Sequence, residues 1–201
     1  EVMYPPVEVD RFSATASRAE YYVTVSRLVA HKRVELIVEA FTRLGLSLLV
    51  IGKGPELPRL RKLAGANVQF CGFVPDKEMA GILSRARGFV AASEEDFGIA
   101  MVEAQAAGCP VIAYGRGGAL ETVIEGRTGI FFDEQRVETL SEAVQRFERR
   151  AGRWDPEAAI ENAGRFSRER FLNEFGRFTG ALPGPHALPV AQLPLPLEGF
   201  K

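Results

Sequence analysis

Charged side chains mark the first place in this sequence where chemistry could be done. Arg27 and Lys32 lie five residues apart in the segment SRLVAHKR, residues 26–33. Two such cations suit a diphosphate, because the planar arginine guanidinium can bind two oxygens while lysine supplies a mobile point charge. An isolated pair of this kind is also common as solvated surface charge, so this segment alone leaves both interpretations open.

A second segment, SEEDFGIAMVEAQAAG at residues 93–108, runs from three acidic residues into a helical pattern. Phe97 and Gly98 separate the acidic residues from the expected helix, which begins near Ile99. The free amides at the start of a helix can bind an anion. Acidic residues in this place can also simply complement the helix dipole, which would account for them without any ligand.

The helix dipole accounts for the acidic residues 94–96, among them Glu95, but it does not account for a further glutamate of this segment, Glu103. Glu103 stands just over one turn inside an otherwise apolar helix of alanine, methionine and valine. We therefore expect Glu103 to reach the same cleft as Glu95. Carboxylates in such a cleft are suited to accept hydrogen bonds from the vicinal hydroxyls of a ribose or a hexose.

A glycine-rich segment, GRGGALETV at residues 115–123, is the third candidate for a part of a functional site. We expect it to be a turn, in which Gly117 and Gly118 allow a close backbone approach or a positive φ. Paired glycines are frequent in loops, so this segment alone says little about function.

Several familiar motifs are missing. The Gly-x-Gly of GKGPEL, residues 52–57, lacks the third glycine of a dinucleotide-binding loop, and neither a P-loop nor a Gly-x-Ser-x-Gly elbow occurs. Cys71 and Cys109 lie far apart in apolar surroundings, which predicts two reduced core thiols. No cysteine or histidine spacing indicates a metal site, so we expect none.

The elements that must position these residues follow from the alternation of short apolar runs with helical segments. A typical helical segment, residues 32–44, has apolar residues at helical spacing. Such alternation predicts an α/β fold with a doubly wound, parallel, Rossmann-like sheet of about six strands. The expected strands are residues 21–26, 47–52, 67–72, 88–93, 110–114 and 129–132.

Length and composition set the outer limits. The 201 residues carry a net charge of −1 and are 46% hydrophobic, which disfavours a dedicated nucleic-acid binder and intrinsic disorder. We expect an extended linker region at residues 1–18, one domain at 19–180 and a proline-rich tail at 181–201. An acidic, proline-broken start and the lack of a long apolar run predict a cytoplasmic protein without a membrane span.

Taken together, these segments resemble the C-terminal, nucleotide-sugar-binding domain of family-4 retaining glycosyltransferases of the two-domain GT-B type. The resemblance covers about residues 4–178 and is strongest in EDFGIAMVEAQAAGCPVIAYGRGGALETV, which is similar to the family's Glu-x-Phe-Gly-x4-Glu stretch. Glu95 and Glu103 stand at the two acidic positions. The amino-acid sequences of these segments are most similar to those of mannosyltransferases of polysaccharide or lipid-linked glycan assembly.

The resemblance implies a role for each candidate residue. Arg27 and Lys32 would hold the donor's diphosphate and offset the charge of the leaving nucleotide, while Glu95 would contact the hydroxyls of the donor sugar; these three are the expected catalytic residues. Gly72, Phe73 and Val74 would pack against the nucleotide base. The backbone amides of Phe97, Gly98 and Ile99 would bind the sugar or phosphate. Glu103 would bind the ribose.

The resemblance also implies partners. The donor would be a GDP- or UDP-linked sugar, with no metal or other cofactor, and the acceptor a glycan or a lipid-linked glycan. An N-terminal domain that binds this acceptor is missing here, so we expect the chain to bind nucleotides weakly and to transfer no sugar alone. Any attachment to a membrane surface would run through that missing domain. A non-catalytic nucleotide-sugar-binding module, or part of a GT-B epimerase or phosphorylase, are the alternatives.

Overall fold

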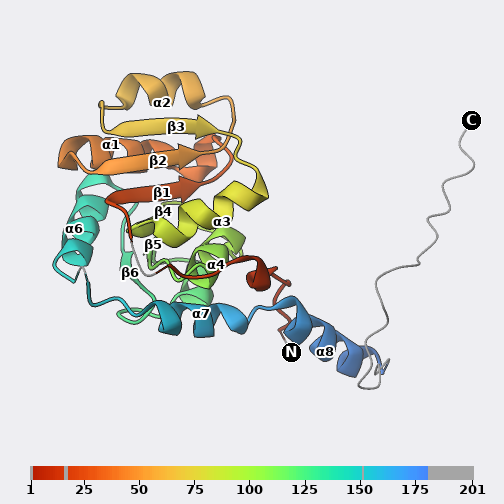
Figure 1. Cartoon of the computed structure of the whole chain (residues 1–201). Helices are drawn as coiled ribbons and strands as arrows, with labels where there is room; N and C mark the ends of the chain where they lie inside the picture. The colour runs from red at the N-terminus through yellow and green to blue at the C-terminus, as the bar shows by residue number, and fades with distance from the viewer. Residues whose placement is uncertain (1, 16–17, 151, 181–201) are drawn as a thin grey trace, which may run out of the picture.

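A six-stranded parallel sheet forms the centre of the computed structural model, which describes residues 2–15, 18–150 and 152–180 (Figure 1). The strand order is β3-β2-β1-β4-β5-β6. The prediction of a doubly wound Rossmann-like sheet is confirmed, and each predicted strand lies within two residues of the observed one. The strands are β1 (Tyr21–Val25), β2 (Ser47–Ile51), β3 (Val68–Gly72), β4 (Gly88–Ala91), β5 (Val111–Tyr114) and β6 (Gly129–Phe132).

Helices follow every strand, as parallel pairing requires. Local signals set their ends: the Asp155 side chain accepts a hydrogen bond from the amide of Glu157, and a left-handed Gly45 ends the first long helix. The helical elements are η1 (Val9–Arg11), η2 (Ala30–Lys32), α1 (Val34–Leu44), α2 (Leu57–Leu63), α3 (Asp76–Arg85), α4 (Ile99–Ala106), α5 (Ala119–Thr122), α6 (Val137–Glu148), α7 (Pro156–Gly164) and α8 (Arg168–Thr179).

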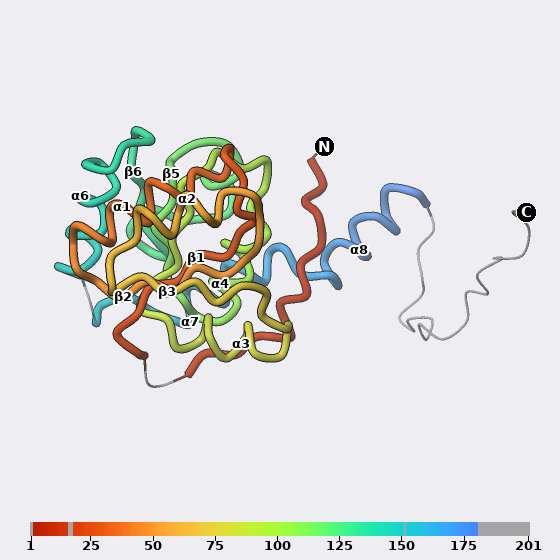
Figure 2. The backbone as a smooth tube through the Cα atoms, turned by 90° about the horizontal axis from the view of Figure 1, so that it is seen from above, coloured from red at the N-terminus to blue at the C-terminus, as the bar shows by residue number. Residues whose placement is uncertain are grey.

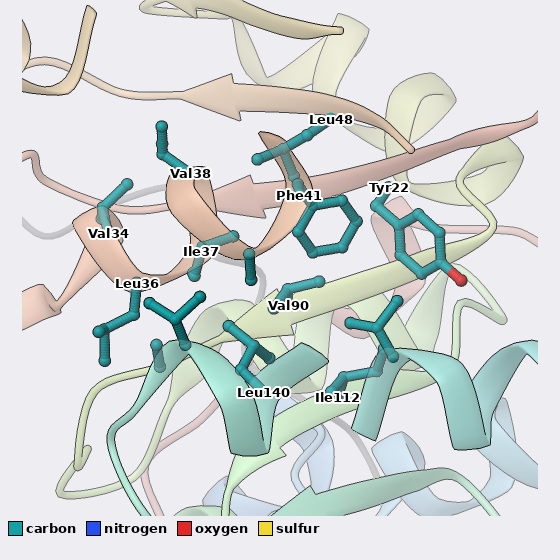
Figure 3. Packing of buried hydrophobic residues seen from close by; sticks show 14 of the residues in the cluster. Tyr22, Val34, Leu36, Ile37, Val38, Phe41, Leu48, Val90, Ile112 and Leu140 are labelled. Atoms are coloured by element: carbon teal, nitrogen blue, oxygen red, sulfur yellow. The ribbon is translucent and has the colours of Figure 1, made fainter. Parts of the chain in front are cut away.

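The sheet buries both of its faces, so its strands are apolar throughout. Successive residues alternate between two cores: Tyr22 packs with Phe41 of α1 and Phe147 of α6, whereas Val23 packs with residues of α3, α4 and α7. Figure 3 shows the first core, a cluster between the sheet and the helices α1 and α6 to which Tyr22, Phe41 and Leu140 belong. This packing fixes the strand ends that carry the loops of the site.

The order of the strands creates a crevice at the carboxyl ends of the two central strands, β1 and β4. The chain runs outward from β1 to β2 and β3 and then returns to β4, which pairs with the other side of β1. The loops that follow β1 and β4 therefore diverge at the carboxyl ends of these strands. Ligands of doubly wound sheets bind at this switch point.

Two short segments differ from the sequence predictions. Residues 119–122 form the helix α5 where a turn was expected, and the segment near residue 10, expected to contain no helix, forms the single turn η1. The expected linker also packs against the domain: Val7 and Phe12 are buried, and the amide of Val7 donates to the carbonyl of Phe166 at 2.8 Å. The start of the chain thus packs against the junction between α7 and α8, and Figure 2 shows it passing beside this part of the backbone.

The last described helix, α8, projects from the rest of the domain (Figure 1). Three of its apolar side chains are exposed, namely Leu172, Phe175 and Phe178. The predicted domain limits at residues 18 and 180 stay predictions, and the predicted proline-rich tail at 181–201 lies outside the described residues.

Candidate functional site

A cavity of about 510 Å³ opens at the carboxyl ends of β1 and β4. Its floor is made by the ends of these strands, and its walls by the loop that leads to α1 and the loop that leads to α4. This is the crevice that the strand order predicts. Six of the predicted site residues line it: Arg27, Lys32, Glu95, Phe97, Gly98 and Ile99.

Lys32 and Glu95 form an ion pair across this cavity. The ammonium nitrogen of Lys32 lies 2.8 Å from Oε1 and 2.7 Å from Oε2 of Glu95. The Ser93 hydroxyl also donates to Oε1 of Glu95. Both charged side chains are about one-fifth exposed, so the pair is sheltered but open to a ligand. The pair fixes the position of each charge and leaves little net charge between them.

Arg27 differs from Lys32 in having no such partner. Its side chain is exposed, and it forms no ion pair with any other described residue. The backbone turns sharply after the loop, because Arg33 adopts the left-handed conformation with a φ of 53° before α1 begins. This cavity wall therefore offers one cation that is free for an anionic ligand and one that a ligand must share with Glu95.

The helix α4 begins at the cavity without a side-chain cap. Gly98 precedes it in the left-handed conformation, with a φ of 85°, and no side chain accepts a hydrogen bond from its first turn. Ile99, the first helical residue, is half exposed. Uncapped amides at a helix start favour a negatively charged or oxygen-rich ligand.

The paired glycines after β5 support the loop that carries Glu95. The amide of Gly118 donates to the carbonyl oxygen of Glu95 at 2.6 Å, and Gly117 has a φ of 57°. A Cβ atom at Gly118 would lie 2.4 Å from the Cα of Phe97. The prediction of a close backbone approach at this glycine pair is confirmed, and the partner is the site loop itself.

The glycines of GKGPEL support the opposite loop. A Cβ atom at Gly52 would lie 1.8 Å from the carbonyl oxygen of Ser26, and one at Gly54 would lie 2.2 Å from that of Leu28. Two side chains there would displace the loop that carries Arg27. The sequence excluded a dinucleotide-binding role for this motif, and the structure gives it a different one: close packing of the end of β2 against the loop after β1.

Glu103 does not line the cavity, which corrects the expectation that it reaches the same cleft as Glu95. Its position on α4 faces η1 and α3 instead. A guanidinium nitrogen of Arg11 lies 2.9 Å from Oε1 of Glu103, and a second lies 2.6 Å from Oδ2 of Asp76. Burial raises the pKa of Glu103, and the charge of Arg11 opposes this rise.

Gly72, Phe73 and Val74 also lie outside the cavity lining: Gly72 ends β3, and Phe73 and Val74 follow in the next loop. Gly72 is left-handed and its carbonyl oxygen accepts a hydrogen bond from the amide of Gly52 at 2.7 Å. Phe73 is 70% exposed, with the Lys53 ammonium 5.8 Å from its ring centre. An exposed aromatic ring on a fixed loop is suited to cover a flat, apolar group.

Sequence reasoning missed two side chains. Ser93, which donates to Glu95, stands only two residues before it and could have been noticed as a neighbouring hydroxyl. Arg11 carries no local signal, because its partner Glu103 is 92 residues away in the chain. Within the described ranges, no group of three or more histidine, cysteine or acidic side chains is placed to hold a metal ion, and no helix has the length and apolarity to cross a membrane.

Comparison with known proteins agrees with this geometry. Residues 8–165 match the family described as glycosyl transferases group 1. The chain belongs to this family. Among curated group 1 relatives, it is 35% identical to the GDP-mannose-dependent alpha-(1-6)-phosphatidylinositol monomannoside mannosyltransferase of Mycobacterium tuberculosis, over 72% of the chain and 45% of that enzyme. The chain thus spans about half the length of this relative.

Solved glycosyltransferases share the fold of this group 1 domain. Sucrose-phosphate synthase from Thermosynechococcus elongatus superposes with a TM-score of 0.78 and 24% identity, covering 90% of the chain and 52% of that enzyme. Anabaena HepE, solved in complex with UDP and glucose, superposes with a TM-score of 0.78 and 18% identity, covering 90% and 57%. At such identities the likeness establishes the architecture alone, which is a Rossmann-like domain that matches about half of each of these GT-B glycosyltransferase structures.

Proposed function

We propose that this domain binds the nucleotide-sugar donor of a retaining glycosyltransferase that transfers mannose or another hexose to a glycan or lipid-linked acceptor. The observation that carries the proposal is the Lys32–Glu95 ion pair at the switch point, beside the unpaired Arg27. The cations Arg27 and Lys32 lie beside the carboxylate of Glu95. A nucleotide sugar needs both kinds of group, because its diphosphate attracts cations and its sugar hydroxyls donate to a carboxylate. Family membership adds independent support, since relatives of this chain are glycosyltransferases.

The two cations account for the leaving group. When the bond between the sugar and the diphosphate breaks, the bond's electrons stay with the diphosphate and its negative charge grows. Arg27 and Lys32 stabilise this charge, and positioned cations of this kind act most strongly where charge develops in the transition state. We propose that they do so without a metal ion, so that a chelator leaves donor binding unchanged.

The carboxylates and amides account for the sugar and the nucleoside. Glu95 accepts hydrogen bonds from the sugar hydroxyls, and the amides at Gly98 and Ile99 donate to the sugar or phosphate. Glu103 and the loop around Phe73 lie outside the residues that line the cavity. We assign the ribose to Glu103 and the base to that loop.

The choice of mannose and of GDP rests on relatives. The mycobacterial enzyme at 35% identity is named as a GDP-mannose-dependent mannosyltransferase, whereas the structural neighbour HepE is a complex with UDP and glucose. GDP-mannose is therefore the first donor to test, and UDP-glucose is the comparison.

A second domain completes the proposed enzyme and binds the acceptor. The chain spans 45% of the mycobacterial relative, and the exposed apolar residues Leu172, Phe175 and Phe178 of α8 offer a surface for such a domain. We propose that it precedes this one and that this chain alone transfers no sugar. We further propose a cytoplasmic enzyme, with any membrane attachment through the other domain.

Calorimetric titration of the purified chain with GDP, UDP, GDP-mannose and UDP-glucose tests the proposal. Arg27→Ala is expected to weaken binding of the preferred nucleotide by about ten- to a hundredfold, because a hydrogen bond to a charged group contributes about 1.5–3 kcal/mol. Arg61→Ala, at an exposed arginine of α2, serves as the matched control and is expected to change nothing. Equal affinities for both variants would exclude Arg27 from the phosphate site.

A transfer assay separates the enzyme from a non-catalytic binding module. The chain is incubated with GDP-mannose and a lipid-linked acceptor, first alone and then with the other half of a group 1 mannosyltransferase supplied as a separate chain. The proposal expects transfer only from the combination. Transfer by the chain alone would refute its dependence on a second domain, and binding without transfer in either arm would favour the module.

A further inference from the structure

Three charged side chains from distant parts of the chain meet in a cluster outside the cavity. Arg11 of η1 donates to Oε1 of Glu103 on α4 at 2.9 Å and to Oδ2 of Asp76 on α3 at 2.6 Å. No hydrogen bond within the described part of the chain occupies Oε2 of Glu103. The Glu103 side chain is only 21% exposed, so its rotation is restricted.

We infer that Arg11 is a positioning residue for the donor: it holds Glu103 by one oxygen and leaves the other oxygen free to accept hydrogen bonds from the ribose hydroxyls. The inference rests on the proposed function and assigns part of it to the linker. Through Arg11, the segment before β1 becomes a component of the nucleotide site rather than a passive connection.

Simple stabilisation of the linker does not require this arrangement. Val7 and Phe12 already bury their side chains against the domain, and the backbone bond from Val7 to Phe166 fixes the same segment. The contact between Arg11 and Asp76 is an exposed ion pair, which adds little to stability. Arg11 stands between two carboxylates, one of them on the helix that begins at the cavity, and it acts to lower the pKa of that one, Glu103.

The protonation state of Glu103 follows from its neighbours. Burial raises the pKa of Glu103, Arg11 lowers it, and Asp76 raises it. Within the described chain, α5, α7 and the strands that pack against α4 bring no other charged group to this carboxyl. Ribose hydroxyls need the ionised form as an acceptor, so nucleotide binding weakens as the pH falls through the pKa of Glu103.

Two variants move this dependence in opposite directions. Arg11→Gln removes the charge that lowers the pKa, so the midpoint of the binding curve moves to higher pH. Asp76→Asn removes a charge that raises the pKa and leaves Arg11 to Glu103 alone, so the midpoint moves to lower pH. Arg11→Lys retains the charge and is expected to recover part of the native behaviour. A residue that only stabilises the fold would not produce opposite shifts.

The experiment measures binding of GDP, its 2′,3′-dideoxy form and inorganic pyrophosphate by calorimetry across a pH series, with UDP and its dideoxy form if UDP binds more tightly. The native chain is expected to prefer the nucleotide with both hydroxyls by about tenfold, as for a hydrogen bond to a charged group. In Arg11→Gln this preference is expected to fall to within about twofold at neutral pH, with pyrophosphate binding unchanged. Arg168→Gln, which removes the linker contact to Glu8, is the control and is expected to keep the preference.

The possible outcomes distinguish a failure of the proposed function from a failure of the role assigned to Arg11. A native chain that binds nucleotides no better than pyrophosphate would overturn the proposed function, and this inference with it. A native preference for the hydroxyls that persists in Arg11→Gln, with an unmoved pH midpoint, would overturn the inference alone. An equal loss for all three ligands, together with a lower melting temperature, would assign Arg11 to stability and likewise overturn it.

Discussion

The ammonium group of Lys32 lies within hydrogen-bonding distance of both carboxylate oxygens of Glu95, at 2.8 and 2.7 Å, although 63 residues separate the two. Lys32 belongs to the loop after β1 and Glu95 to the loop after β4. Their pairing spans the switch point of the sheet. A diphosphate that enters this cavity must therefore share Lys32 with a carboxylate, whereas a sugar can use that carboxylate directly.

The pairing predicts opposite effects of Glu95→Gln on two ligands. Loss of the carboxylate releases Lys32 and removes a negative charge, so bare GDP is expected to bind about two- to fivefold more tightly, the range for a partly exposed ion pair. GDP-mannose is expected to lose the additional affinity that it owes to its sugar. Calorimetry with both ligands measures the difference, and an equal loss for both would place Glu95 outside the sugar site.

Much of this arrangement could be predicted from the sequence, because hydrophobic periodicity and strand topology are strong constraints. Six apolar runs separated by helical segments allow few topologies, and a doubly wound sheet brings the ends of its first and fourth strands together. The loops of Arg27 and Glu95 therefore had to meet. Their meeting required no information beyond the order of the elements.

Other features depend on side-chain direction, which spacing alone does not define. Glu103 lies four residues after Ile99, close to it around the helix, yet it faces η1 rather than the cavity. The contact with Arg11 could not be predicted, because it joins positions 92 residues apart. Likewise, the sequence gave no partner for Gly54 or Gly118, and only the structure identified the backbone that each approaches.

Those two glycines give a prediction about the loops that they support. Neither has a positive φ, so Gly54→Ala and Gly118→Ala act only through the added methyl groups, which would lie 2.2 and 2.4 Å from the backbone of Leu28 and Phe97. We expect each variant to weaken nucleotide binding by at least about tenfold and to lower the free energy of unfolding by about 1–3 kcal/mol.

Gly164→Ala provides the matched control for the glycine series. It lies in α7 with no atom within 4 Å of the added methyl, so we expect native binding and equal or slightly higher stability. Native binding by both Gly54→Ala and Gly118→Ala would show that the loops tolerate displacement and that their close packing does not position the site.

The two cysteines are expected to react with a thiol reagent at different rates. Burial raises the pKa of the Cys109 thiol to about 12, and its side chain is inaccessible; Cys71 is half-buried, and burial raises its pKa less severely. Because the thiolate is the reacting form, the folded chain should lose one thiol slowly and the second only in denaturant. Cys71→Ala should abolish the slow phase, and rapid loss of both thiols from the folded chain would contradict this burial.

A second charged cluster lies near the amino ends of β1 and β4, at the opposite end of these strands from the cavity. We expect it to stabilise the fold and not to take part in binding. Arg87, just before β4, donates to both carboxylate oxygens of Glu148 at the end of α6, at 2.6 and 2.5 Å, and the buried hydroxyl of Tyr22 also donates to Glu148. Burial acts to raise the pKa of Glu148, but the hydrogen bonds and charge of these partners together hold it below its ordinary value. Glu148 thereby joins the first and fourth strands to the helix that covers them.

The lowered pKa of Glu148 gives the sign of a pH dependence. A carboxyl whose pKa is lower in the folded than in the unfolded state stabilises the fold above its ordinary pKa of about 4.3, and this contribution is lost as the pH falls through the folded-state pKa. Glu148→Gln is therefore expected to lower the free energy of unfolding by about 1–2 kcal/mol at pH values near 7. Urea unfolding across a pH series should show this difference shrink below the ordinary pKa, while nucleotide binding stays native. Glu142→Gln, at an exposed position of the same helix, is the control, and an equal effect of both variants would mean that net charge rather than the Arg87 contact produces the change.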